Sequence, residues 1–284
     1  MAESRANDEQ IAYWNEKAGP KWVAMQERLD AQLASLEGAL LERAALLPGE
    51  RVIDIGCGCG STTLEAAARV GPGGAVLGAD ISRPMLERAR ERAAAAGLKN
   101  ADFAEADAQV FPFAPGQADA VISRFGVMFF ADPAAAFANI RRALTPAGRL
   151  CFVCWRPMSE NPWMRVPLAA AAKHLELPPP PEPHAPGPFA FDDAEWVRSI
   201  LDMAGYSSIQ IDRHDARLPI GNSADIERSV DFAIDIGPVS SLLMGKGDDI
   251  RSAVRASIRE ALTPLLTPEG VVADFATWLV SART

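Results

Sequence analysis

Arg51-Val-Ile-Asp-Ile-Gly-Cys-Gly-Cys-Gly-Ser-Thr-Thr63 joins a short apolar run to a row of alternating glycines. The β-branched residues before Gly56 predict a buried strand. Thr62, with Glu65 three residues later, fits a capping box, so we expect a helix to begin here. A strand that enters a helix through a glycine loop is typical of a nucleotide-binding turn. The backbone can approach a ligand closely there, and the helix start offers unpaired N–H groups.

Further strand-like runs follow this turn and alternate with helix-like segments. The expected strands are 75–79, 101–105, 118–122, 149–155, 207–213 and 271–280. Because strands that alternate with helices form parallel sheets, the sequence predicts a Rossmann-like, doubly wound α/β fold with helices on both faces of one sheet. No internal repeat and no clear linker divides the chain, so we expect one domain with insertions.

Three segments stand outside the alternating pattern. Residues 1–47 carry apolar residues at helical spacing, and Gly19-Pro20 is expected to break them into two helices. Residues 156–190 are rich in proline, and residues 222–266 have the pattern of further helices. We therefore predict an N-terminal helical flap over residues 1–47, and a domain over 48–284 whose two insertions form a helical substrate cap.

The composition is that of an acidic, core-forming protein. Its 284 residues are 49% hydrophobic, and 28 basic against 37 acidic side chains give a formal net charge of −9. A negative surface repels phosphate backbones, so we expect no nucleic-acid partner. No run of about 18 apolar residues predicts a membrane span, and the polar, acidic start does not resemble a signal peptide. These features predict a cytoplasmic protein.

The four cysteines do not form a recognisable framework. Cys57 and Cys59 flank a loop glycine, and Cys151 and Cys154 lie in an apolar run. A zinc site built from the two pairs is the alternative, but neither paired CxxC spacing nor a nearby histidine supports it. We therefore expect reduced thiols and no metal site.

The spacing of the glycines separates two classes of nucleotide site. A dinucleotide fingerprint needs G-x-G-x-x-G, whereas this loop has G-x-G-x-G and Ser61 stands at the third glycine position. Asp80 ends the second strand, where a carboxylate can accept hydrogen bonds from both ribose hydroxyls. Asp107 follows the third strand and could accept a hydrogen bond from an adenine amine. The alternatives are a helix-dipole partner for Asp80 and a loop cap for Asp107.

Taken together, these motifs resemble the class I S-adenosylmethionine-dependent methyltransferases, in particular the small-molecule group that includes the ubiquinone and menaquinone C-methyltransferases. The matching stretches are Val52–Gly60, Gly78–Ser82, Ala106–Ala108, Ala118–Phe125 and Leu144–Leu150. The resemblance covers roughly residues 48–155. It implies a seven-stranded sheet whose last strand, 271–280, is antiparallel to the others.

The resemblance also implies S-adenosyl-L-methionine as the cofactor and assigns roles to residues. The implied cofactor contacts are Tyr13, Trp22, Asp54, Gly56, Cys57, Gly58, Gly60, Asp80, Ile81, Asp107, Ala108, Ser123, Arg124 and Phe125. In this assignment Asp54 and the glycine loop hold the methionine part, and Asp80 takes the ribose hydroxyls. Tyr13 and Trp22 would belong to a flap over the cofactor, although simple helix packing is the alternative for both.

Methyl transfer from a sulfonium is an in-line displacement, so positioning and exclusion of water supply much of the catalysis. A base is needed only where the acceptor must lose a proton. His174 and His184 lie in the first insertion and are weak candidates, and His214 is weaker. Arg124 could clamp a substrate carboxylate or orient a loop carboxylate.

The acceptor is expected to be a small molecule. Trp155, Trp163, Met128, Phe129 and Phe130 could line a pocket for an apolar or aromatic acceptor, although such residues usually mean core. A methyltransferase is the leading hypothesis. A non-catalytic S-adenosylmethionine sensor or scaffold is an alternative, and so is a nicotinamide-dependent oxidoreductase, against which Ser61 at the third glycine position argues. The atom that is methylated and the oligomeric state stay open.

Overall fold

The computed structural model describes residues 7–284, so residues 1–6 of the predicted flap lie outside the described part of the chain. Its strands are β1 (Arg51–Ile55), β2 (Ala75–Asp80), β3 (Ala101–Glu105), β4 (Ala118–Arg124), β5 (Leu144–Trp155), β6 (Ser207–Pro219), β7 (Leu266–Thr267) and β8 (Gly270–Arg283). Its α-helices are α1 (Asp8–Tyr13), α2 (Gly19–Ala24), α3 (Gln26–Ala44), α4 (Ser61–Val70), α5 (Arg83–Ala95), α6 (Pro133–Ala143), α7 (Pro162–Ala171), α8 (Ala194–Met203), α9 (Ile226–Asp235), α10 (Pro238–Leu242) and α11 (Asp248–Leu262).

The central sheet has the strand order β3-β2-β1-β4-β5-β8-β6. Strands β1 to β5 pair in parallel, and β8 is antiparallel to both β5 and β6. The α/β fold and the antiparallel last strand that the sequence predicted are thus confirmed. The two-residue strand β7 pairs with β8 outside this order, at the end of a segment for which the sequence predicted only helices.

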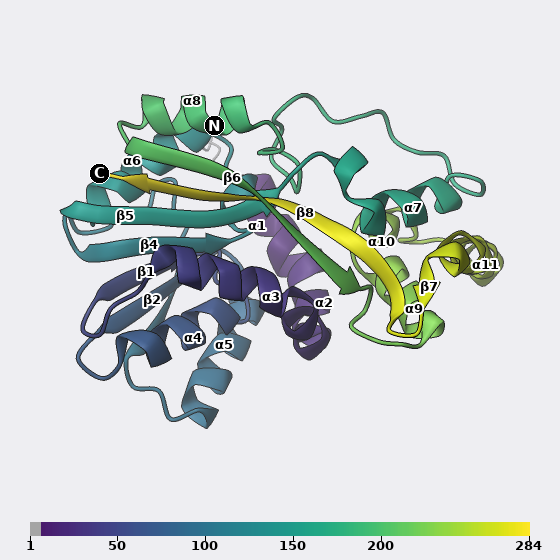
Figure 1. Cartoon of the computed structure of the whole chain (residues 1–284), viewed down its shortest axis with the longest axis horizontal. Helices are drawn as coiled ribbons and strands as arrows, with labels where there is room; N and C mark the ends of the chain where they lie inside the picture. Colours follow the sequence, from purple (N-terminus) through teal and green to yellow (C-terminus); the bar gives the residue numbers. More distant parts are fainter. Residues whose placement is uncertain (1–6) are drawn as a thin grey trace.

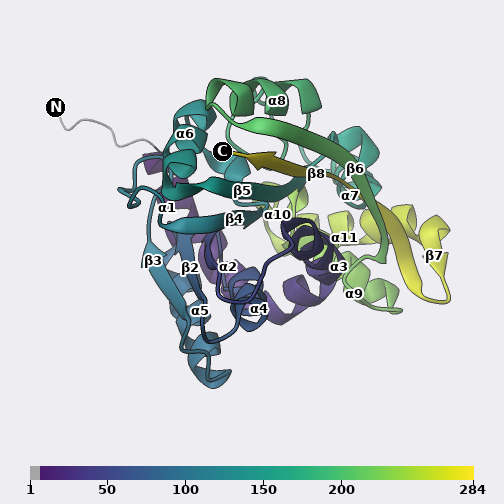
Figure 2. The same ribbon diagram turned by 60° about the vertical axis from the view of Figure 1, so that its left-hand side comes forward.

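Helices cover both faces of the sheet. Helices α3 and α4 pack on one face, whereas α6 and α8 pack together against β5 and β6 on the other (Figures 1 and 2). The β-branched run of β1 supplies the centre of the core, because Val52, Ile53 and Ile55 are each about 2% exposed. Burial on both faces explains why apolar residues occupy neighbouring positions of this strand rather than alternate ones only.

Four helices from the two insertions gather beyond one end of the sheet (Figure 1). Helix α7 packs against α9, α10 and α11, and it also contacts β8. Strands β6 and β8 are longer than the sequence predicted, and their ends reach these helices (Figure 1). We call α7, α9, α10 and α11 the helical cluster.

The predicted break at Gly19-Pro20 is wrong. The chain stays helical from Asp8 to Ala24, with a π-helical segment at Trp14–Ala18, and the interruption comes at Met25. A wider turn accommodates Pro20, which has no N–H to give to the preceding turn. Gly19 is needed for close packing, since a Cβ there would lie 2.5 Å from the Ser82 hydroxyl and 2.1 Å from the Trp14 carbonyl oxygen.

The predicted capping box at the start of α4 is also wrong. The N-cap is Gly60, with a φ of 84°, and no side chain caps the helix. Thr62 lies two positions past this N-cap, and its hydroxyl donates instead to Glu37 of α3 at 3.2 Å. The helix therefore begins from a glycine in the left-handed conformation, without a side-chain cap.

Candidate functional site

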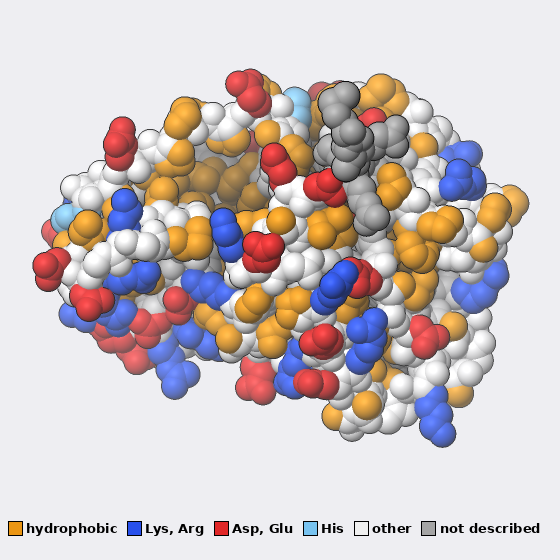
Figure 3. Space-filling view, turned by 180° about the vertical axis from the view of Figure 1, so that it is seen from behind, with side chains coloured by type: hydrophobic (Ala, Val, Ile, Leu, Met, Phe, Trp, Pro, Cys, Tyr) orange, Lys and Arg blue, Asp and Glu red, His pale blue; other side chains and the backbone are white. Residues whose placement is uncertain are grey.

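A cavity of about 640 Å³ lies at the carboxyl edge of the parallel strands. Its walls come from the N-terminal helices, the loops after β1, β2, β3 and β4, and both insertions. The face of the molecule in Figure 3 has a hollow with hydrophobic side chains inside it. The lining includes these predicted site residues: Tyr13, Trp22, Gly56, Cys57, Gly58, Asp80, Ile81, Asp107, Ala108, Arg124 and Phe125. This position, outside the strand ends of an open sheet, is where such folds bind ligands.

The glycine loop takes its shape from three left-handed residues. Gly56, Gly58 and Gly60 have φ values of 66°, 54° and 84°. A residue with a side chain adopts such positive φ values only at an energetic cost. The Gly58 N–H donates to Asp80 Oδ2 at 2.8 Å, and the Ser82 N–H donates to Asp80 Oδ1 at 2.8 Å. Asp80 thereby ties the loop after β1 to the start of α5. Burial raises the pKa of the Asp80 carboxyl above its ordinary value.

Asp54 lies beneath the loop and outside the cavity lining. Its side chain is buried, and its Oδ2 accepts a hydrogen bond from the Thr63 hydroxyl at 2.7 Å. Its Oδ1 is buried without a hydrogen-bond partner in the described structure. Burial raises the pKa of Asp54 to about 7. An unsatisfied buried carboxylate oxygen is costly, and such atoms concentrate at functional sites.

Asp107 presents a second unsatisfied oxygen at the other end of the site. Its Oδ1 accepts from the Asn7 amide at 2.9 Å and from the Gln109 N–H at 3.0 Å. Its Oδ2 is buried and has no hydrogen-bond partner in the described structure. Asn7 also accepts from the Ala131 N–H at 2.6 Å. The start of the described chain therefore lies over the strand ends and orients Asp107.

The end of β4 shapes the floor of the cavity. The Ser123 hydroxyl is fully buried, donates to the Ile55 carbonyl at 2.7 Å, and accepts from the Gly126 N–H at 3.1 Å. Ser123 thus lies beneath the cavity and joins β4 to β1, and Gly60 likewise lies outside the lining. Phe125 lines the cavity with a φ of 64°, a strained conformation for an aromatic residue, and its ring stacks on Trp155 at 4.1 Å.

Arg124 faces two carboxylates of α3 that the sequence interpretation missed. Its guanidinium lies 3.3 Å from Glu37 and 3.7 Å from Asp30 as ion pairs, and its Nη1 has no hydrogen-bond partner in the described structure. Asp30 also pairs with Arg92 at 2.8 Å. The seven-residue spacing of the two carboxylates places them on one helix face. Only the packing of α3 across the strand ends brings them to Arg124.

Aromatic side chains of the N-terminal helices form the opposite wall. Tyr13, Trp14 and Trp22 all line the cavity, and Trp14 contacts Trp22 and Phe129 edge to face at 5.6 and 5.3 Å. Trp14, which was not among the predicted cofactor contacts, therefore lines the cavity too. Tyr13 remains 40% exposed, so this wall lies between the cavity and solvent.

The histidines lie elsewhere. His174 is exposed and hydrogen-bonds Ser257 at 2.7 Å, and His184 is exposed and stacks on Trp196. His214 lies within β6 rather than after it. None of these three residues lines the cavity. The four cysteines are buried free thiols, and among residues 7–284 no group of three or more potential ligands is arranged to hold a metal ion.

Comparisons with known proteins show what part of this chain is similar to. Residues 52–148 match the family model described as a methyltransferase domain. Aklanonic acid methyltransferase DauC of Streptomyces sp. is 37% identical over 113 residues, which are 40% of this chain and 51% of that protein. Demethylmenaquinone methyltransferase of Thermus thermophilus is 42% identical over 108 residues, which are 38% of this chain and 48% of that protein. The chain thus spans about half the length of these curated relatives.

A solved structure extends the likeness of fold over most of the chain. The [4+2]-cyclase SpnF matches with a TM-score of 0.56 and 19% identity, covering 94% of this chain and 96% of that one. At this identity the match supports the fold alone. None of the helices in the described chain is long and apolar enough to cross a membrane. The predicted resemblance is confirmed by the match of residues 52–148 to the methyltransferase-domain model.

Proposed function

We propose that this chain transfers a methyl group from S-adenosyl-L-methionine to a small-molecule acceptor. The observation that carries the proposal is a pair of buried carboxylate oxygens without partners, Asp54 Oδ1 and Asp107 Oδ2. They flank Asp80 and the glycine loop on the edge where nucleotides bind in open α/β sheets. A ligand with a hydrogen-bond donor at one end and hydroxyls beside it could pair with Asp107 and Asp80, which line the cavity, while Asp54 lies beneath the loop that would hold its other end.

The residues present fit the cofactor part by part. Asp107 Oδ2 can accept from the adenine amine, with Ala108 beside it, and Asp80 can take the ribose hydroxyls beside Ile81. Asp54 and the backbone of Gly56–Gly60, with Cys57, would hold the methionine part above Ser123. Arg124 and Phe125 would lie near the sulfonium, and Tyr13 and Trp22 would cover the cofactor as part of the flap.

S-adenosylmethionine supplies an electrophilic methyl group on a good leaving group. What remains for the protein is to hold the acceptor in line, close and dry. Trp155, Trp163 and Phe275 are nearly or fully buried side chains at the part of the cavity next to the helical cluster. We infer an apolar or aromatic acceptor and assign the two insertions, 156–190 and 222–266, to a substrate cap over the domain of residues 48–284.

The names of the relatives agree with such an acceptor. One acts on aklanonic acid and the other on demethylmenaquinone. The formal net charge of −9 favours a small molecule over a nucleic acid. A cytoplasmic location remains a prediction from the sequence.

A second function has a specific observation in its favour. One of the solved structures that match most of the chain is described as a cyclase rather than a methyltransferase. A protein with this fold can therefore hold an acceptor-like ligand without being named for methyl transfer, and the sensor or scaffold hypothesis belongs to the same class. The hypothesis of a nicotinamide-dependent oxidoreductase loses support, because the family model matches the glycine loop as part of a methyltransferase domain.

Two measurements separate these functions. Calorimetry with S-adenosylmethionine should show that Asp80→Ala weakens binding by about 1–3 kcal/mol, the cost of charge-assisted hydrogen bonds, whereas Asp102→Ala on the exposed face of β3 should not. Unchanged affinity in Asp80→Ala would contradict the cofactor assignment. Incubation with methyl-labelled cofactor and a metabolite extract should give a labelled small product. Tight binding without any labelled product would favour the non-methylating alternatives.

A further inference from the structure

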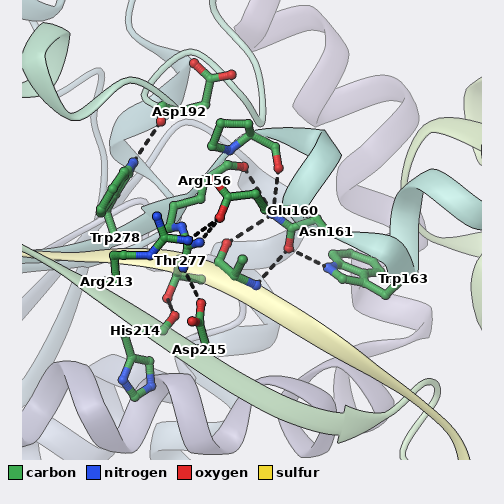
Figure 4. Close-up of polar contacts among 12 residues, drawn as sticks. Arg156, Glu160, Asn161, Trp163, Asp192, Arg213, His214, Asp215, Thr277 and Trp278 are labelled. Atoms are coloured by element: carbon green, nitrogen blue, oxygen red, sulfur yellow. Dashed lines mark hydrogen bonds and ion pairs between the residues drawn. The ribbon is translucent and has the colours of Figure 1, made fainter.

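The turn between β5 and α7, residues 156–161, is fixed by buried side chains. Arg156 is only 2% exposed, although it carries a charge. Its guanidinium forms ion pairs with Glu160 of the same turn and with Asp215 of β6, and it lies 5.4 Å from the centre of the Trp278 ring. Figure 4 shows these groups converging on the turn from β6 and β8. Both ends of the turn are therefore held against the two long strands.

Asn161 ends this turn, and its side chain binds to backbone groups outside its own helix. It is the N-cap residue of α7, a position where asparagine commonly caps the helix, yet its side chain makes no capping bond. Its amide instead pairs with Ala276 of β8: Oδ1 accepts from the Ala276 N–H at 2.9 Å, and Nδ2 donates to the Ala276 carbonyl at 3.1 Å. Nδ2 also donates to the Arg156 carbonyl at 3.1 Å.

This pairing lies at the end of the β5–β8 ladder, where the Arg156 N–H also donates to the Ala276 carbonyl at 3.1 Å. The register of β5 and β8 ends at Trp155 and Thr277, and the next residue, Ala276, is paired by the Asn161 side chain. Asn161 is completely buried. The Asn161 side chain is therefore held in one position. If it moved, the backbone groups that it pairs with would be left without hydrogen-bond partners in the interior.

A further hydrogen bond of Asn161 connects it to a side chain of the cavity. The indole N–H of Trp163 donates to Asn161 Oδ1 at 3.2 Å (Figure 4). The Trp163 ring stacks on Phe275 at 4.8 Å with an interplanar angle of 6°, and it lies 5.3 Å from Trp155. Trp155 in turn stacks on Phe125. These four rings, which we call the aromatic wall, all line the cavity.

We propose that Asn161 is a positioning residue for the acceptor: by fixing the Trp163 indole it holds the aromatic wall rigid, so that the cavity selects a planar aromatic acceptor. The proposal rests on the proposed function and deepens it. Aromatic rings prefer defined offset or edge-to-face contacts, so fixed rings favour a flat partner over a puckered one of equal apolar area. The selectivity follows from pre-organisation, since no ring has to be ordered on binding.

The test compares two ligands that share one carbon skeleton. 2-Naphthol is flat, and 2-decalol is its saturated, puckered counterpart. Calorimetry on the full chain with saturating S-adenosylhomocysteine should show 2-naphthol binding at least tenfold more tightly than 2-decalol. Equal affinities would overturn the proposal. Binding of S-adenosylhomocysteine is measured separately, so a failure of the proposed function is recognised by its absence.

Variants then test the role of Asn161. Asn161→Leu and Trp163→Phe should bring the ratio of the two affinities close to one and remove the near-ultraviolet circular dichroism of the fixed indole. Trp196→Phe, which lies outside the cavity lining, is the matched control and should keep the ratio of the unmodified protein.

A merely structural role gives a different result. In that case Asn161→Leu would lower the melting temperature while the folded fraction kept its preference for 2-naphthol. Should Asn161→Leu fail to fold, Trp163→Phe decides by itself, because it removes only the tethered indole. An unchanged affinity ratio in Trp163→Phe would overturn the proposal.

Discussion

Gly56 and Gly126 lie backbone to backbone where β1 and β4 end, so close that a Cβ on Gly56 would be 2.5 Å from the Gly126 Cα. A Cβ on Gly126 would in turn be 2.6 Å from the Gly56 Cα. The glycine loop and the strained residue Phe125 can therefore approach each other only because neither glycine has a side chain. This contact fixes the distance between the two loops that form the floor of the cavity.

Gly56→Ala should accordingly be far more damaging than Gly58→Ala. The added methyl group at position 56 meets backbone, which cannot move aside, whereas at position 58 it meets the terminal methyl of Met85 at 2.8 Å. Both positions have a positive φ, so the backbone strain of an alanine is common to the two variants. We expect Gly56→Ala to cost roughly 2 kcal/mol more in the free energy of unfolding, in the range of other core disruptions. Urea titration measures this, and equal losses would contradict the contact.

The sequence predicted the parts of the site that follow from strand order. Asp54, Asp80 and Asp107 each lie in or directly after an apolar run, and parallel strands end at one edge, so their proximity needed no knowledge of packing. Gly126 could not be predicted in this way, because its role depends on the neighbouring β1. Asp30 was missed for the same reason, since only the path of α3 brings it to the cavity.

The errors have physical causes of the same kind. Gly19-Pro20 has the local chemistry of a helix break, but packing of Gly19 against Ser82 and a widened turn keep the chain helical. Thr62 and Glu65 have the local chemistry of a capping box, but Gly60 is the N-cap of α4 and the Thr62 hydroxyl donates to Glu37 of α3. Tertiary contacts overrode local preference in both places.

Phe125 offers a test of strain against packing. Its ring is 8% exposed and stacks on Trp155, while its backbone has a φ of 64°. Phe125→Ala loses the ring and keeps the strain, and large-to-small changes of this kind cost about 3–5 kcal/mol. Phe125→Gly loses the ring but accepts the left-handed backbone, so it should be more stable than Phe125→Ala by about 1 kcal/mol. Denaturant titration of both variants checks the order, and an alanine variant at least as stable as the glycine variant would show that the backbone is not strained.

The ion pair of Glu50 and Arg149 should make the free energy of unfolding depend on pH in the acidic range. Arg149 donates to the two carboxylate oxygens at 2.8 and 2.6 Å, and these hydrogen bonds hold the pKa of Glu50 below its ordinary value of 4.5. A depressed pKa in the folded state contributes stability above the unfolded value, and this contribution is lost as pH falls through the folded value. Glu50→Gln should cost about 1.5–3 kcal/mol at neutral pH and progressively less below about pH 4.5.

The matched control for Glu50→Gln is Glu65→Gln. Glu65 pairs with Arg69 at 3.1 Å on an exposed helix face, where such pairs contribute about 0.3–0.5 kcal/mol. Unfolding of both variants, followed between neutral pH and pH 3, distinguishes the two pairs. A pH-independent loss in Glu50→Gln would mean that the lost contact is packing rather than charge.

The contribution of Asp54 to stability should depend on pH in the opposite direction to that of Glu50. Burial raises its pKa from 3.8 to about 7 in the folded state. Between these two values the folded protein retains a proton that the unfolded chain has lost, so the stability due to this group falls as pH rises from about 4 to 7 and is level above that. Asp54→Asn removes the titration while its amide oxygen can still accept from Thr63. The difference in unfolding free energy between the parent protein and Asp54→Asn should therefore move in favour of the variant over this window, by about 1.4 kcal/mol for each unit of pKa shift. Thermal unfolding of both proteins from pH 4 to 8 measures it, and two parallel pH profiles would show that Asp54 is ionised throughout.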